Sequence, residues 1–182
     1  KNERYQMRFE RLTNEKHEMY KKALELYSIS FPSHEQRDMV SQTKILKDGD
    51  YCFNLIYDEE AFVGLALCWE TKSFVYVEHF CILPEMRNKK YGQKVLQLLC
   101  QNGKMVILEI DPPVDVISIR RKRFYERGGF VENPYFHVHP PYRRENSGHT
   151  LVIMSFPKTI PQAEYDAFKY YLEHHVMKDV FS

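Results

Sequence analysis

One stretch of the sequence, residues 80–92, constrains the fold more than any other. The apolar run Phe80–Leu83 leads through Pro84 into the basic, glycine-containing segment Arg87–Gly92, after which an amphipathic helix begins. The first turn of a helix has unpaired backbone N–H groups and the positive end of the helix dipole, and both attract an anion. The sequence therefore predicts a strand, a turn and a helix that together bind a phosphate-like group.

Length and composition predict one globular domain that covers residues 1–182. Of its residues, 43% are hydrophobic and 28% are charged, and the net charge is +1. Such a chain can bury an ordinary core, and it has no overall field that would draw it to nucleic acid or to a membrane. Lysine and arginine are nevertheless concentrated between Arg87 and Arg123, around the expected anion site. We expect no nucleic-acid partner and no membrane partner.

The four cysteines, Cys52, Cys68, Cys81 and Cys100, lie in apolar runs and show no CxxC spacing. This pattern favours buried free thiols in a reducing compartment and does not indicate a metal site. No apolar run approaches the ~20 residues of a membrane span, and no signal-peptide pattern opens the chain. A cytoplasmic protein is expected.

Hydrophobic periodicity and turn residues predict the order β-α-α-β-β-β-α-β-α-β-β-α. The expected strands are 5–12, 51–57, 61–70, 73–83, 105–110, 130–136 and 150–156. The expected helices are 14–28, 33–47, about 91–102, 116–127 and 162–177. Strands interleaved with helices indicate a mixed α/β sheet with helices on both faces.

A second basic segment lies some thirty residues after the first. The helix expected there reads Ser118-Ile-Arg-Arg-Lys-Arg-Phe-Tyr125, and Gly128, Gly129 and Phe130 follow it. A tyrosine in this place adds a proton donor to the anion site. In the alternative interpretation Tyr125 is a core aromatic residue and the two glycines only end the helix.

The two segments together resemble the acetyl-CoA site of the GNAT N-acetyltransferase superfamily. Arg87 and Gly92 match the family signature Arg/Gln-x-x-Gly-x-Gly/Ala, whereas Lys90 replaces its first glycine. We expect Lys90 to be helical and still to offer its N–H. The resemblance implies that the backbone of Ile82 pairs with pantetheine like an added strand. It also implies that the pyrophosphate is held by the backbone of Asn88, Lys89, Lys90, Tyr91 and Gly92. The GNAT fold has the predicted element order over residues 5–156, and the helix at 162–177 is additional.

The tyrosine helix matches the family pattern in part. Ser118 and Arg121 stand where family members typically carry Asn and Ala. The resemblance implies that Ser118 hydrogen-bonds a pantetheine amide and that Arg121 reaches the CoA phosphates. It also implies that Tyr125 protonates the departing thiolate.

A base is needed on the acceptor side, because an amine must lose a proton when it attacks a thioester. Glu78 has the same strand parity as Ile82, so both are expected on one face, with His79 on the other and structural. Several family members have a glutamate base on this strand, and Glu78 is our first choice. Glu109 and Asp111, at the end of a central strand, and a water chain are the alternatives.

Two segments are expected to form walls of the acceptor pocket. One is residues 31–37, beginning with Phe31, and the other is the long connection 137–149, which includes Tyr142. Tyr135, Phe136 and Tyr142 are candidates to hold a cationic amine between aromatic faces.

The resemblance predicts an N-acetyltransferase that moves acetyl from acetyl-CoA directly to a primary amine in a ternary complex, without a metal. The rival is a non-catalytic acyl-CoA-binding or regulatory relative, which the departures at Lys90, Ser118 and Arg121 favour. Turnover with any amine separates the two. The sequence carries no dimer signature, and a homodimer stays open.

Overall fold

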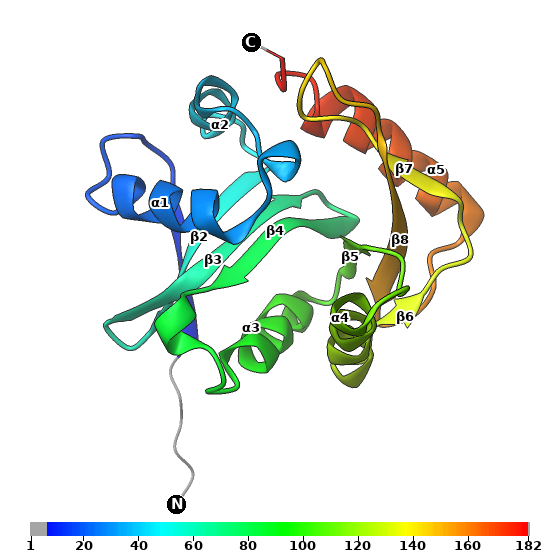
Figure 1. Ribbon diagram of the computed structural model, residues 1–182, viewed down its shortest axis with the longest axis horizontal. Helices are drawn as coiled ribbons and strands as arrows, with labels where there is room; N and C mark the ends of the chain where they lie inside the picture. Colours follow the sequence, from blue (N-terminus) through cyan, green and yellow to red (C-terminus); the bar gives the residue numbers. More distant parts are fainter. Residues whose placement is uncertain (1–6, 182) are drawn as a thin grey trace, which may run out of the picture.

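The computed structural model describes residues 7–181, in which eight strands form one mixed sheet (Figure 1). The strand order is β1-β2-β3-β4-β5-β8-β6, and β7 pairs with β8 beside this path. The strands are β1 (Met7–Leu12), β2 (Tyr51–Asp58), β3 (Ala61–Glu70), β4 (Phe74–Ile82), β5 (Met105–Ile110), β6 (Val131–Glu132), β7 (His137–His139) and β8 (His149–Phe156).

β4 and β5 form the only parallel pair among these strands. Their pairing joins Phe74–Val77 to Met105–Leu108, yet β4 continues to Ile82 and β5 to Ile110. The two strands therefore part in the middle of the sheet. The end of β4 is left with a backbone edge that no β5 residue pairs with, which an extended ligand can use.

Helices cover both faces of the sheet (Figure 1). Buried side chains of α1, α2 and α5 share one core with Trp69 and Tyr76, and α3 packs with Val77 and Leu108 on the other face, where α4 also lies. The helices are α1 (Tyr20–Ser30), α2 (Met39–Ile45), α3 (Tyr91–Leu99), α4 (Val116–Arg127) and α5 (Gln162–Tyr171). A π-helical turn, η4 (Leu172–Val176), continues α5, and 3₁₀ turns are η1 (Ser33–Glu35), η2 (Pro84–Met86) and η3 (Cys100–Asn102).

The predicted mixed α/β class and most predicted elements are confirmed. The helix expected over 33–47 is wrong as one element, because η1 ends at Glu35 and α2 begins only after Asp38. The Gln36 side chain donates to the carbonyl oxygens of Ser28 and Phe31, which holds the chain in an extended turn. Asp38 then caps α2 by accepting from the backbone N–H of Ser41.

Three further differences concern the start of α1 and the strands β6 and β7. The helix expected from residue 14 begins at Tyr20, because Asn14 and His17 accept backbone N–H groups in turns before it. The strand expected over 130–136 is limited to Val131–Glu132, since Pro134 cannot donate to a ladder. The strand β7, which follows β6, lies in a segment that was expected to be a loop. The predicted strand 5–12 begins outside the described residues.

The C-terminal segment after α5 packs against the start of β2. Asp48 lies 2.9 Å from both His175 Nε2 and Lys178 Nζ. The helix predicted at 162–177 is thus tied to the sheet, not appended to it. All four cysteines are free, as predicted. None of the helices in residues 7–181 is long and apolar enough to cross a membrane.

Candidate active site

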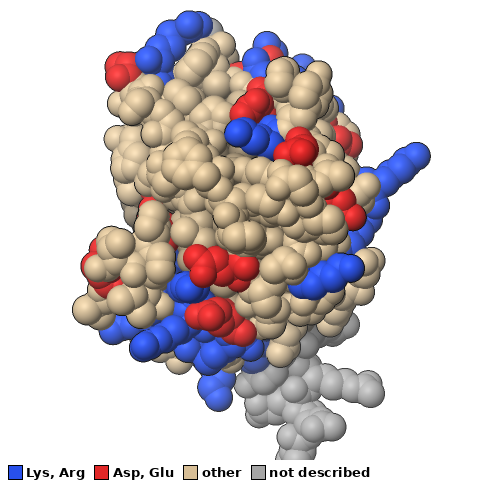
Figure 2. Space-filling model, turned by 90° about the vertical axis from the view of Figure 1, so that its right-hand side faces the viewer, with Lys and Arg blue, Asp and Glu red and all other residues tan. Residues whose placement is uncertain are grey.

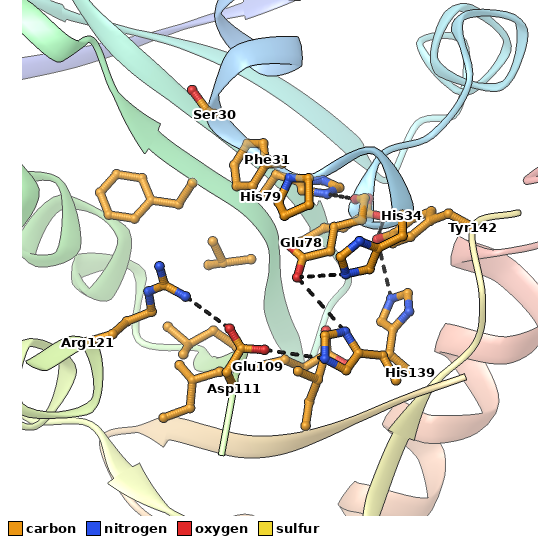
Figure 3. Close-up of a pocket in the computed structure, with 18 of the residues that line it drawn as sticks. Ser30, Phe31, His34, Glu78, His79, Glu109, Asp111, Arg121, His139 and Tyr142 are labelled. Atoms are coloured by element: carbon orange, nitrogen blue, oxygen red, sulfur yellow. Dashed lines mark hydrogen bonds and ion pairs between the residues drawn. The ribbon is translucent and has the colours of Figure 1, made fainter. Parts of the chain in front are cut away.

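A cavity of about 880 Å³ lies where β4 and β5 part. Its walls come from the ends of both strands, the segment after α1, α4 and the connection between β7 and β8 (Figure 3). It brings together residues expected to hold the cosubstrate, to donate the proton and to bind the acceptor. These are Phe31, Glu78, Ile82, Arg87, Glu109, Asp111, Arg121, Tyr125 and Tyr142.

A smaller hollow of about 310 Å³ lies over the basic turn. Of the residues expected to hold pyrophosphate, Arg87, Asn88, Lys90, Tyr91 and Gly92 line it. Ile82 and Arg87 line both this hollow and the large cavity, so the two spaces follow one another along the end of β4. Lys89 and Ser118 line neither space.

The basic turn has an unusual backbone. Asn88 and Lys90 have φ angles of 62° and 63°, in the left-handed region. The expectation of a helical Lys90 is therefore wrong: the lysine adopts the conformation that the family glycine permits. A turn with such backbone angles points several backbone N–H groups into one hollow, and this arrangement can bind an anion. A left-handed φ costs a non-glycine residue about 1–2 kcal/mol, and the rest of the fold stabilises the turn in spite of this strain.

Side chains fix the start of α3 behind this turn. The Tyr91 hydroxyl donates to Asp58 Oδ2 over 2.7 Å. A Cβ atom on Gly92 would lie 3.0 Å from Cζ of Phe124, so α3 and α4 approach closely here. Glycine at position 92 therefore allows α3 and α4 to pack closely, in addition to the approach to the phosphates that the family motif implies.

Ser118 belongs to the N-terminal cap of α4. Its backbone N–H donates to Asp115 Oδ1, and its hydroxyl accepts from the backbone N–H of Asp115. The expected bond to a pantetheine amide is not favoured by this geometry, because Ser118 is buried in the cap. Arg121, one turn later, reaches the cavity rim and lies 3.2 Å from Asp111 Oδ2.

Tyr125 is half-buried and faces the large cavity. Its hydroxyl makes no hydrogen bond to any residue that the structure describes, so it can donate to a ligand. Burial raises the pKa of Tyr125 to about 12, although Arg121 partly opposes the shift. The hydroxyl is therefore protonated at neutral pH, as a general acid must be.

A β-bulge changes which side chains of β4 share a face. Leu67 pairs with His79 and Cys68 with Val77, so Glu78 is an extra residue on β4. Glu78 and His79 consequently both point toward α1 and α5, whereas Ile82 packs in the core on the α3 side. The expectation that Glu78 and Ile82 share a face, with His79 opposite, is wrong.

Glu78 is the centre of a buried polar network. One oxygen accepts from Trp69 Nε1 over 2.9 Å, and the other accepts from the Tyr142 hydroxyl over 2.7 Å and from Arg37 over 3.1 Å. The side chains of Arg37 and Glu78 are both 0% exposed. Burial alone would raise the pKa of Glu78, but Arg37 and the other donors outweigh it and lower this pKa to about 2. A carboxylate held this way accepts protons poorly.

Glu109 has a similar setting. It accepts from the Tyr76 hydroxyl, and its Oε2 lies 2.6 Å from His137 Nε2. Burial again opposes ionisation, but the neighbouring histidines and Tyr76 lower the pKa of Glu109. Both buried carboxylates are therefore charged at neutral pH.

Aromatic rings form part of the cavity wall, but not all of those that the sequence suggested. The Phe31 ring packs against His79 at 4.8 Å between centroids, and Tyr142 stacks on His139 at 4.9 Å. Tyr135 and Phe136 do not line the cavity, so that expectation is wrong. Tyr135 stacks on Tyr165 outside it, and Phe136 is 79% exposed.

Comparison with known proteins agrees with this geometry. The sequence profile described as the acetyltransferase (GNAT) family matches residues 16–130, more than half of the chain. The chain belongs to the GNAT family. The match includes the basic turn, β4, β5 and Tyr125.

Individual relatives are more distant. The "Putative acetyltransferase YjbC" of Bacillus subtilis (strain 168) is 24% identical over 102 residues, which cover 55% of this chain and 52% of that protein. The chain thus matches about half the length of this curated relative. A solved structure described as a putative acetyltransferase from the GNAT family, from Bacteroides thetaiotaomicron, is 29% identical. It superposes with a TM-score of 0.87 over 93% of this chain and 97% of that one.

A third comparison concerns the fold alone. Naa50 of Arabidopsis thaliana, solved in complex with the bisubstrate analogue CoA-Ac-MVNAL, is 16% identical, with a TM-score of 0.57. The match covers 82% of this chain and 97% of that one. The GNAT fold of this chain is therefore shared with a protein that binds a CoA derivative.

The charges of this GNAT chain are unevenly distributed. Figure 2 shows a largely uncharged face with Lys and Arg side chains at its lower edge, the level at which α4 lies in Figure 1, and further ones at its upper and right-hand edges. Two of the α4 cations are paired, Arg121 with Asp111 and Lys122 with Glu132. Neighbouring carboxylates therefore partly balance the cations of α4.

The sequence did not reveal that Arg37 and Trp69 contact Glu78. Arg37 ends an expected pocket wall, but its pairing with Glu78 spans 41 residues and leaves no local pattern. Trp69 gave a weak signal, as the only tryptophan of the chain in a predicted strand.

Proposed function

We propose that this protein is an N-acetyltransferase that moves an acetyl group from acetyl-CoA to a primary amine by direct attack in a ternary complex. The observation that carries the proposal is the continuous path along the end of β4. It begins at the anion-binding turn, follows the unpaired strand edge and reaches a cavity that holds a protonated tyrosine and buried carboxylates.

The turn and the strand edge supply the cosubstrate site. Backbone N–H groups from Asn88 to Gly92 and the positive end of α3 bind the pyrophosphate, and Arg87 adds charge beside it. The backbone of β4 near Ile82 pairs with pantetheine where β5 has diverged. This arrangement places the thioester in the large cavity, close to Tyr125.

Transfer requires one bond to form and one to break. The amine nitrogen attacks the thioester carbonyl carbon, and the carbon–sulfur bond breaks as the carbonyl is restored. Tyr125 donates its hydroxyl proton, or a hydrogen bond, to the departing sulfur, and the amine proton passes to water. Cys81 also lines the cavity, but burial raises the pKa of its thiol and so disfavours a covalent route.

The buried carboxylates give this end of the cavity negative charge that attracts the acceptor, and they do not deprotonate it. Glu78 is balanced by Arg37, whereas Glu109 has no arginine or lysine partner among the described residues. Glu35 and Asp111 add negative charge at the rim. A cationic amine is therefore favoured over an anionic acceptor, with Phe31 and Tyr142 as walls. The proton leaves through water, one of the alternatives to Glu78 as base.

The test is a thiol-release screen after mass spectrometry of the purified protein for bound CoA. Acetyl-CoA is offered with polyamines, amino acids, aminoglycosides and peptides, and free CoA is measured. Release that depends on a primary amine, with an acetylated product of the expected mass, supports the proposal. Tight binding of acetyl-CoA with no turnover of any amine would instead support the non-catalytic relative.

A further inference from the structure

The mouth of the large cavity carries a chain of charged and imidazole side chains from four parts of the fold. His34 and Glu35 come from η1, and His149 is the first residue of β8. Asp111 follows β5, and Arg121 projects from α4. Figure 3 shows Arg121 and Asp111 on one side of the cavity and His34 on the other.

We propose that His34, Glu35 and His149 form a site for a divalent transition-metal ion of the Zn²⁺ type. Glu35 Oε1 lies 3.7 Å from His34 Nε2 and 3.9 Å from His149 Nδ1, and the three ligand atoms are within 4.8 Å of one another. Ligands of a tetrahedral zinc ion at ~2.0–2.1 Å are about 3.3 Å apart. Small side-chain rotations therefore close this set around an ion. Two imidazoles and one carboxylate leave a fourth position open.

A second carboxylate supports the assignment. Metal-bound histidines usually donate the other ring N–H to a carboxylate, which fixes the orientation of the ring. His149 Nε2, on the side of the ring away from Glu35, lies 3.4 Å from Asp111 Oδ1. The other oxygen of Asp111 is held by Arg121 at 3.2 Å. The ring of His149 is thus already oriented with Nδ1 toward His34 and Glu35.

The backbone below the site is also held in place. His79 Nε2 lies 2.7 Å from the carbonyl oxygen of Glu35. Because a carbonyl only accepts, His79 donates here. The His79 ring is buried between Tyr27 and Phe31, so η1 is anchored to β4 beneath the proposed ligands. An ion at this site would link η1 to β8 across the mouth of the cavity.

A second group of similar composition serves as a matched control. Asp48, Asp50 and His175 also lie within ligand distance of one another. There, however, Lys178 Nζ is 2.9 Å from Asp48 Oδ2, and this ammonium already neutralises the carboxylate. We expect no metal binding at this second group.

The effect on activity rests on the proposed function, whereas the metal site itself does not. An ion bridging η1 and β8 carries positive charge to the place where a cationic amine must pass. Zn²⁺ should therefore raise KM for the amine and leave Kd for acetyl-CoA unchanged, because the basic turn lies elsewhere.

The experiment titrates Co²⁺ into the chelator-treated protein and records the visible absorption of tetrahedral cobalt, followed by displacement with Zn²⁺. One ion per chain is expected. His149→Asn should abolish the spectrum, Asp111→Asn should weaken binding about 10- to 100-fold, and His175→Asn should change nothing. Circular dichroism confirms that each variant is folded.

Other results would overturn the proposal. These are no tetrahedral spectrum, a spectrum that survives in His149→Asn, or one lost in His175→Asn. Failure of the amine-acetylation proposal would appear separately, as an intact cobalt spectrum without turnover.

Discussion

The proposed acetyl-CoA side of the cavity is built from one short stretch of chain, whereas the proposed acceptor side joins segments that are far apart. Arg37 contacts the carbonyl of Val176, 139 residues later, and Glu78 contacts Tyr142, 64 residues later. The first side presents backbone groups to solvent and ligand, and the second buries an ion pair. Substitutions on the first side should therefore affect affinity, and substitutions on the second should affect stability.

Arg37→Met gives the largest expected effect. Removing one partner of a buried ion pair costs about 3–5 kcal/mol, because Glu78 is left charged and unpaired. Urea unfolding measures the loss. Lys44→Met is the control, since Lys44 is 63% exposed in its pair with Asp179 and should cost less than about 1 kcal/mol. If the two variants lose equal free energy of unfolding, the buried pair is no more important for stability than the exposed one, and the prediction is wrong.

Tyr125→Phe connects the two sides, because this hydroxyl is expected to act only during transfer. General acid catalysis contributes ~10²–10⁴-fold, and a thiolate is a fair leaving group, so kcat should fall by about 10²-fold. Kd for acetyl-CoA should stay the same, since charge on sulfur develops only in the transition state. Steady-state kinetics and calorimetry measure both. An unchanged kcat in a folded variant would make Tyr125 a core aromatic residue.

Gly92→Asp tests the acetyl-CoA side alone. Its Cβ would lie 3.0 Å from Phe124, and its charge would face the phosphates. Overpacking destabilises the fold by about 1–3 kcal/mol. Repulsion between two unit charges about 4 Å apart costs about 1 kcal/mol in water, so affinity for acetyl-CoA should fall at least about fivefold. Calorimetry at low salt with a chelator present measures it. Gly49→Asp is the control, because no atom lies within 4 Å of a Cβ there. Binding only with a divalent ion would contradict the metal-free site.

Lys90→Gly should stabilise the protein slightly. It relieves a left-handed φ that costs a lysine about 1–2 kcal/mol, less the entropy that glycine gains in the unfolded chain, about 0.5–1 kcal/mol. The free energy of unfolding should therefore rise by about 0–1.5 kcal/mol, as measured by urea unfolding. Lys89→Gly removes the same charge next to it, where φ is not left-handed, and should be slightly destabilising. A loss in both variants would show that the turn is not strained.

Glu78→Gln should leave the pH–rate profile nearly unchanged. The folded pKa of Glu78 is about 2, so its protonation does not coincide with activity near neutral pH. The lower limb of kcat/KM should keep the same apparent pKa. If that limb flattens instead, Glu78 is the base after all.

The same variant has a stability signature. The folded pKa lies below the ordinary value of 4.5, so the charge stabilises the fold above that pH, and this contribution is lost as pH falls from 4.5 toward 2. Glu78→Gln should show a weaker pH dependence of unfolding in this range.

The order of elements and the anion turn could be predicted because both depend on local patterns. Apolar periodicity gave β5 and α4 their bounds, and Arg87 with Gly92 marked the turn. The conformation of Lys90 was missed, because a lysine gives no sign of a left-handed φ. The face of Glu78 was missed for a related reason. Strand parity assumes an unbroken ladder, and the bulge at Glu78 depends on its pairing with β3.

For the acceptor side, the sequence predicted two wall segments, 31–37 and 137–149, but not the residues that they contact. Phe31 and Tyr142 were identified as walls, but nothing in the sequence joined Arg37 to Glu78 or His34 to His149. Such contacts depend on how α1, β4 and β8 pack, and a single sequence does not reveal which distant loops meet.

The bond from Arg37 to the Val176 carbonyl also has a consequence for synthesis. The basic turn and Tyr125 leave the ribosome before residue 176 does. Arg37 leaves earlier still, but it gains its full set of contacts only once residue 176 has emerged. Until then a buried cation lacks one of its partners. A nascent chain should therefore be able to bind the nucleotide end of the cosubstrate before it can position an acceptor. A pause in translation before residue 176 would leave that intermediate exposed to proteases.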